Sequence, residues 1–146
     1  MNFNTHLKLT FDISRDLKLT LFGSYSYNST ENAQFCPTWV WAQGQAYRGE
    51  HKQEDWLGNL TLHYQHTWGA HRLTTNLLGE YQKSNKSGFW TLVKGFTTNL
   101  FGYDNLVAGA TIPYGGTGSS YESPTLGSLM GGLTYTLSDR YSLTLT

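Results

Sequence analysis

Two long alternating runs joined by a very short turn occupy the middle of the sequence, between Trp56 and Tyr81. In the first run apolar and polar side chains alternate, with Leu60, Leu62 and Tyr64 at even positions and Asn59, Thr61 and His63 at odd positions. Successive side chains of a β-strand point to opposite faces, so this run predicts a strand with one apolar face. The alternation resumes after Trp68, Gly69 and Ala70, which predicts an antiparallel hairpin.

The same pattern recurs near both ends of the sequence. Hairpins are predicted at about 5–27, 56–84 and 126–146, with short turns at 14–16, 68–70 and 138–140. The segments of about 28–55 and 85–125 lose the alternation and are rich in polar residues, glycine and aromatic residues, so we interpret them as long loops. These features predict an all-β fold, an antiparallel up-and-down meander of about six long strands.

Composition agrees with strands and excludes several classes of function. The chain has 16 Gly, 10 Tyr, 7 Phe and 5 Trp, a usage typical of β-structure. No window holds the roughly 18 consecutive apolar residues of a transmembrane helix. Ten basic residues balance ten acidic ones, which argues against nucleic acid as a partner. Cys36 is the only cysteine, so an intramolecular disulfide is excluded.

Short turns at one end of the hairpins and long loops at the other are typical of outer-membrane β-barrels. The run from Leu17 to Tyr27 would span roughly 25 Å at a 45° tilt, which matches the apolar band of such barrels. A soluble antiparallel sheet with one solvated face gives the same alternation, so both interpretations stay open on periodicity alone. The barrel interpretation makes residues 1–146 a single partial barrel segment, whose lipid-facing side chains are Leu19, Leu21, Leu60, Leu62, Leu73 and Leu77.

Two segments resemble a known family. The segment LMGGLTYTLSDRYSLTLT at 129–146 is similar to a strand-turn-strand of TonB-dependent transporters of the SusC/RagA type, close to FFGRLNYSYKDRYLLTA. The matching residues are Gly131, Leu133, Tyr135, Asp139, Arg140, Tyr141, Leu143 and Thr144, while Gly132 replaces the usual Arg. FTTNLFGYDNLVAGA at 96–110 is similar to the family's preceding loop. The resemblance covers about the last third of the chain.

The resemblance implies a nutrient transporter of the bacterial outer membrane that imports oligosaccharides or peptides. It also implies a SusD-like surface lipoprotein and TonB as partners of the full-length protein. Members of the family carry a signal sequence, a plug, a TonB-contacting segment and a barrel of twenty-two strands. None of the first three is recognisable here, so we expect an internal piece of barrel wall without activity of its own.

No pattern in the sequence predicts an enzyme, a metal site or a cofactor. His63 and His66 are three residues apart and therefore face opposite sides of a strand, which prevents joint chelation. Gly115 to Ser119 lacks the lysine and the strand-to-helix context of a phosphate-binding loop. We therefore predict no catalytic residue and no metal ligand.

Aromatic residues in the predicted loops are the candidates for ligand contact, because flat rings stack on sugars or pack against a partner. The candidates are Trp39, Trp41, Tyr47, Trp90, Tyr103, Tyr114 and Tyr121. The alternative function is a soluble β-sandwich that binds carbohydrate through these loops. Two stacked sheets with Leu60, Leu62, Leu73 and Leu77 buried between them would favour that alternative.

Overall fold

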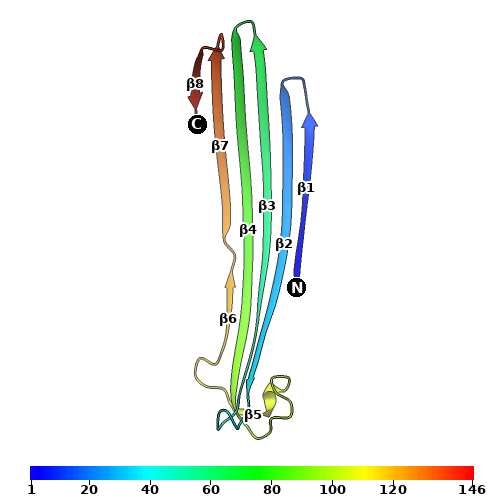
Figure 1. The fold of residues 1–146 in the computed structure, drawn as a ribbon, viewed down its shortest axis with the longest axis vertical. Coiled ribbons are helices and arrows are strands. Elements are labelled where there is room, and N and C mark those ends of the chain that lie inside the picture. Colours follow the sequence, from blue (N-terminus) through cyan, green and yellow to red (C-terminus); the bar gives the residue numbers. More distant parts are fainter. The chain divides into compact units, whose positions relative to one another are not determined.

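A computed structural model describes residues 1–146, and all of its strands belong to one antiparallel sheet (Figure 1). The strands are β1 (Asn2–Asp12), β2 (Leu17–Cys36), β3 (Gln45–Trp68), β4 (His71–Phe96), β5 (Gly109–Thr111), β6 (Thr117–Glu122), β7 (Thr125–Leu137) and β8 (Tyr141–Leu145). A single 3-10 turn, η1 (Leu106–Ala108), precedes β5. The structure contains no helix with the length and hydropathy that a membrane span requires.

The predicted all-β antiparallel meander is confirmed. The order of the main strands is β1-β2-β3-β4-β7-β8, so each main strand lies beside the next one in the sequence. The short strands β5 and β6 both pair with β4 (Figure 1). The sheet is open, because β1 and β8 each have one neighbour only.

The chain divides into two compact units. Unit 1 comprises Met1–Phe3, Tyr27–Glu54 and Asn85–Ser123, and unit 2 comprises Asn4–Ser26, Asp55–Ser84 and Pro124–Thr146. Unit 2 therefore holds the three predicted hairpins, and unit 1 holds most of the two segments predicted as loops. The prediction that residues 1–146 form a single barrel segment stays a prediction.

Unit 2 has the register that alternation predicts. His71 to Lys83 pair without interruption with Leu137 to Thr125, and Leu133 to Leu137 pair with Leu145 to Tyr141. The turns fall at 14–16, 69–70 and 138–140, in agreement with the sequence. Gly69 adopts φ +57° in the two-residue turn, a conformation that costs glycine little and that matches the twist of hairpin strands.

The long loops predicted at 28–55 and 85–125 are wrong over much of their length. β2 continues to Cys36, β3 begins at Gln45, β4 continues to Phe96, and β6 covers 117–122. Residues 38–43, between β2 and β3, form a turn. Both faces of these strands carry polar residues, so the contrast of apolar and polar positions that marks a half-buried strand is absent from the sequence.

The only buried hydrophobic residues of the chain lie in unit 1. Ala46, Val93 and Phe96 are buried, and Phe35, Leu106 and Ala108 pack against them. The rings of Phe35 and Phe96 meet edge to face with centroids 5.6 Å apart, a favourable arrangement for aromatic pairs. This small core fixes the η1 turn against the ends of β2, β3 and β4.

Candidate functional site

The six leucines predicted to face lipid lie on one face of unit 2, which we call the leucine face. Directly paired residues share a face, and Leu73 pairs with Tyr135 while Leu133 pairs with Leu145. Ring contacts extend the face across the sheet, because Tyr25 of β2 touches Trp56 of β3. Alternation along each strand then places Leu19, Leu21, Leu60, Leu62, Leu73 and Leu77 together.

The leucine face has no protein layer over it. Leu60 is 41% exposed and Leu77 is 39% exposed, and no residue of unit 2 is buried. A water-soluble domain of this size would bury most of its large apolar side chains. An uncovered apolar face of this extent is typical of a surface that meets another apolar phase or partner.

The opposite face of unit 2 is polar and carries hydrogen bonds between strands. His63 Nδ1 lies 2.6 Å from Asn76 Oδ1, and the hydroxyl oxygens of Thr134 and Thr144 are 3.3 Å apart. Ser26 and Ser84 both donate to the Asp55 carboxylate. The predicted opposition of leucines to Thr, Asn and His is therefore present in the sheet.

Aromatic rings form a continuous stack at the turn end of the leucine face. His66 stacks on Trp68 with centroids 5.5 Å apart, Trp68 on His71 at 5.9 Å, and His71 lies 5.9 Å from Tyr135. His66 also pairs with Asp16 at 2.7 Å, which joins β3 to the turn after β1. On β3 the leucines Leu60 and Leu62 thus lie between the Trp56–Tyr25 contact and this stack.

The aromatic residues predicted as ligand contacts all lie in unit 1, but they fall into two groups. Trp39 is 78% exposed, Tyr114 fully exposed and Tyr121 71% exposed, and Trp41 and Tyr103 are also exposed. Tyr47 and Trp90 lie within β3 and β4 and contact neighbouring glycines, where Tyr47 is half-buried and Trp90 is 38% exposed. Whether any of the seven binds a ligand stays a prediction.

Hydrogen bonds hold the turn that carries Trp39 and Trp41 against a second loop. The Thr38 backbone N–H donates to Asn99 Oδ1 at 3.0 Å, and the Asn99 amide donates back to Thr38 Oγ1 at 2.9 Å. Lys94 Nζ lies 6.0 Å from the centre of the Trp41 ring, at the outer limit of a cation–π contact. The Thr38–Asn99 hydrogen bonds thus fix the turn that carries the two exposed tryptophans.

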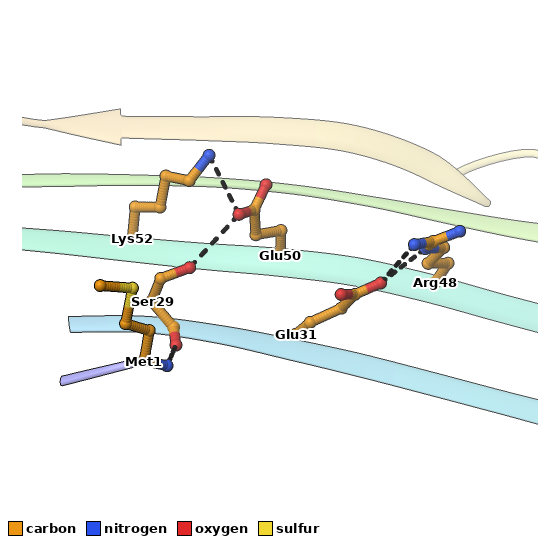
Figure 2. A network of polar contacts seen from close by, with 6 residues as sticks. All are labelled: Met1, Ser29, Glu31, Arg48, Glu50 and Lys52. Carbon is orange, nitrogen blue, oxygen red and sulfur yellow. Dashed lines mark hydrogen bonds and ion pairs between the residues drawn. The ribbon is translucent and has the colours of Figure 1, made fainter.

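A network of charged side chains links β2 and β3 in unit 1 (Figure 2). Arg48 pairs with Glu31 at 2.6 Å, Lys52 with Glu50 at 3.0 Å, and Ser29 Oγ donates to Glu50 at 3.3 Å. We call the face that carries these residues the ionic face of unit 1. Sequence analysis missed this network, although the period-2 recurrence of Arg48, Glu50 and Lys52 was a visible signal.

The network alters the ionisation of two groups. The hydrogen bond from Lys52 is the largest cause that lowers the pKa of Glu50 below its usual value. Desolvation opposes it, and the charge of Lys52, the hydrogen bond from Ser29 and the charge of Arg48 lower the pKa further. The same contact with Glu50 raises the pKa of Lys52. Both side chains lie at the surface, so these shifts reflect local pairing and not burial.

The structure contains no group of three or more His, Cys, Asp or Glu residues that could hold a metal ion. His63 and His66 contact different partners, Asn76 and Asp16, and Cys36 is a free thiol. The features that remain as candidates for function are the leucine face and the surfaces of unit 1.

Comparison with known proteins gives structural neighbours only. No protein-family model matches the sequence, and no curated protein matches it. The chain is similar to a chain of the RagAB peptide transporter, with a TM-score of 0.78 and 16% identity over 94% of this chain and 16% of that chain. It is also similar to chains of the RagAB peptide importer in the "closed-closed" state (TM-score 0.75) and the "open-open" state (TM-score 0.64), each at 16% identity.

These likenesses establish the fold and no more. The matches cover 93% of this chain in the "closed-closed" state and 94% in the "open-open" state, and 15% of the neighbour in both. The chain therefore spans about a sixth of the length of the solved chains that it resembles. The sheet of this chain has the same strand arrangement as a part of those transporter chains.

Proposed function

We propose that the chain is part of the barrel wall of a SusC/RagA-type, TonB-dependent nutrient transporter in the bacterial outer membrane. In this proposal the leucine face contacts lipid and the polar face of unit 2 lines the lumen. The strands of unit 1 and their connections lie outside the cell. The chain has no enzymatic activity and no transport activity alone. The whole transporter imports oligosaccharides or peptides.

One observation carries the proposal: unit 2 has an extended leucine face and no buried residue. Alternation of apolar and polar residues with a hydrocarbon-facing exterior is the arrangement that membrane barrels use. On β3, Trp56 and Trp68 lie about 40 Å apart along the strand, or about 28 Å along the axis of a barrel with 45° tilt. Rings at both ends of an apolar band of this height suit the two membrane interfaces.

The likeness to transporter chains supports the proposal at the level of the fold. The resemblance of residues 129–146 to the SusC/RagA hairpin supports it at the level of the sequence. By the same resemblance, we propose a SusD-like surface lipoprotein and TonB as partners of the longer protein. The soluble carbohydrate-binding sandwich gains no support, because the eight strands form one sheet and not two stacked layers.

Protease accessibility on intact cells tests the proposal. Antibodies against the segments 37–44 and 97–116 should detect cleavage by external protease, because these connections lie outside the cell. The turns at 69–70 and 138–140 should be cut only after the outer membrane is opened. Recovery of the chain in a soluble fraction, or cleavage confined to the short turns, would contradict the proposal.

A further inference from the structure

The three short turns of unit 2 lie at the same end of its sheet (Figure 1). The Gln65 backbone N–H donates to the Asp16 carbonyl oxygen at 2.8 Å, which ties the first turn to the end of β3. The Ser138 backbone N–H donates to the Ala70 carbonyl oxygen at 2.6 Å, which ties the third turn to the second. We call the turns at 14–16, 69–70 and 138–140 together the turn edge.

The four arginines of the chain differ in whether they have a partner. Arg48 and Arg72 each pair with an acidic side chain, at 2.6 Å and 3.7 Å. Arg15 and Arg140 are exposed and make no ion pair and no side-chain hydrogen bond. Both of the unpaired arginines belong to the turn edge.

The acidic side chains at the turn edge are already engaged with other groups. Asp12 lies 3.4 Å from Lys18 Nζ, and Asp16 lies 2.7 Å from His66 Nδ1. The third, Asp139, holds the paired arginine of β4. The two unpaired arginines therefore leave an excess of positive charge at this end of unit 2, which favours an anionic partner.

Large apolar side chains are exposed directly beside both unpaired arginines. Ile13, next to the first turn, is 58% exposed, and Tyr141, the residue after Arg140, is 71% exposed. Leu143 pairs with Tyr135 of the leucine face, so alternation puts Tyr141 on that face too. A partner held by Arg140 therefore also meets an apolar surface.

Trp68 stands beside the middle turn of the turn edge. The stack described above holds it between His66 and His71, whose Nδ1 atoms contact Asp16 and the Tyr135 hydroxyl. Trp68 nevertheless remains 44% exposed. An indole has a large apolar body and one polar N–H, and it favours the level of the headgroups in a bilayer.

From this arrangement we propose that the turn edge binds an anionic phospholipid, with the lipid phosphate on Arg15 and Arg140. A guanidinium group donates two parallel hydrogen bonds to a phosphate. The acyl chains of the same lipid lie along the leucine face, and Trp68 packs at the level of the headgroup. A zwitterionic phospholipid is disfavoured, because its own ammonium group neutralises the phosphate.

This lipid site rests on the proposed function, because it takes the leucine face as the surface that meets lipid. The two fail separately. Equal affinity for anionic and zwitterionic phospholipid would overturn the lipid site and leave the barrel wall standing. Protease cleavage confined to the short turns on intact cells would overturn the barrel topology, whatever the lipid preference.

Native mass spectrometry of the 146-residue chain in dodecyl maltoside micelles tests the lipid site. Phosphatidylglycerol and phosphatidylcholine with identical acyl chains are added in equal amounts, and the lipids that stay bound after removal of the micelle are counted. Phosphatidylglycerol should be retained several-fold more than phosphatidylcholine. Equal retention of the two lipids, or retention of neither, would overturn the site.

Arg15→Gln and Arg140→Gln should each lower the retention of phosphatidylglycerol roughly fivefold, the effect of one cationic side chain at an anionic membrane surface. Lys94→Gln is the matched control, because it removes the same charge from unit 1, where Lys94 makes no ion pair. It should leave the preference unchanged. Equal losses from Lys94→Gln and Arg15→Gln would reflect the net charge of the chain and contradict the assignment.

Chemical modification of the unaltered chain removes the dependence on folded variants. Phenylglyoxal modifies accessible guanidinium groups, and peptide mapping by mass spectrometry resolves all four arginines. Phosphatidylglycerol should slow the modification of Arg15 and Arg140 several-fold relative to phosphatidylcholine, and it should leave that of Arg48 in unit 1 unchanged. Equal rates at Arg15 and Arg140 in the two lipids would overturn the site.

Discussion

Leu62 and Thr61 are neighbours in sequence and lie on opposite faces of β3. If the leucine face meets lipid, Leu62→Arg should destabilise the inserted protein by about 2 to 4 kcal/mol, because it brings a charge near the bilayer midplane. Thr61→Arg should be tolerated, because it points to the polar face. Urea unfolding of both variants in lipid vesicles measures the difference, and equal costs would contradict the assigned facing.

Glu50 should show a pH dependence that depends on Lys52. The pKa of Glu50 is lowered in the folded chain, so its contacts with Lys52 and Ser29 stabilise above the ordinary glutamate pKa and are lost as pH falls through the lowered value. NMR titration of the Glu50 carboxyl should give a midpoint below that of an ordinary glutamate. Lys52→Met should move the midpoint upward, and an unchanged midpoint would contradict the assigned cause.

At the scale of elements, sequence predicted the strands that have two chemically different faces. The hairpins of unit 2 follow from alternation of leucine with threonine, asparagine and histidine, and their turns fall where the sequence places them. The extensions of β2, β3 and β4 into unit 1 could not be predicted in this way. One face there is ionic and the other also carries polar and charged side chains, such as Lys86 and Glu122, so hydropathy does not alternate although side-chain direction does.

The candidate site was predictable in part for the same reason. Alternation identified the leucine face, and aromatic content identified Tyr47 and Trp90. Neither signal revealed that Gly118, which is distant in sequence, lies against the indole of Trp90, because this contact depends on the pairing of β4 with β6. Residues in sheets acquire their neighbours from register, which a single sequence specifies weakly where both faces are polar.

Hydrogen exchange tests the elements that the sequence did not predict. Backbone amides in 45–54 and 85–94 should exchange slowly, because β3 and β4 are inner strands of the sheet. Amides of the turn at 38–43 should exchange fast by comparison. Equally fast exchange throughout 28–54 would restore the long loop that the sequence indicated.

For the whole molecule, the open sheet predicts an inactive chain. β1 and β8 each have one neighbour, so the outer edges of both strands carry backbone groups without a strand partner. Hydrocarbon does not tolerate such edges, and a membrane strand pairs on both sides. Vesicles loaded with the 146-residue chain should therefore show no uptake of oligosaccharide above that of empty vesicles. Specific, saturable uptake would contradict the partial barrel.

The uncovered leucine face has a consequence for where such a chain would reside. On β3, Trp56 and Trp68 mark the two ends of the apolar band, and the distance between them is fixed by the ladder. In the proposed membrane setting this distance sets the hydrocarbon thickness that the surrounding bilayer must match. A bilayer with longer acyl chains must thin against the strands, at a cost of fractions of a kcal/mol for each ångström of mismatch. The acyl composition of the host membrane would then set the stability of unit 2, as the packing of a core does for a water-soluble domain.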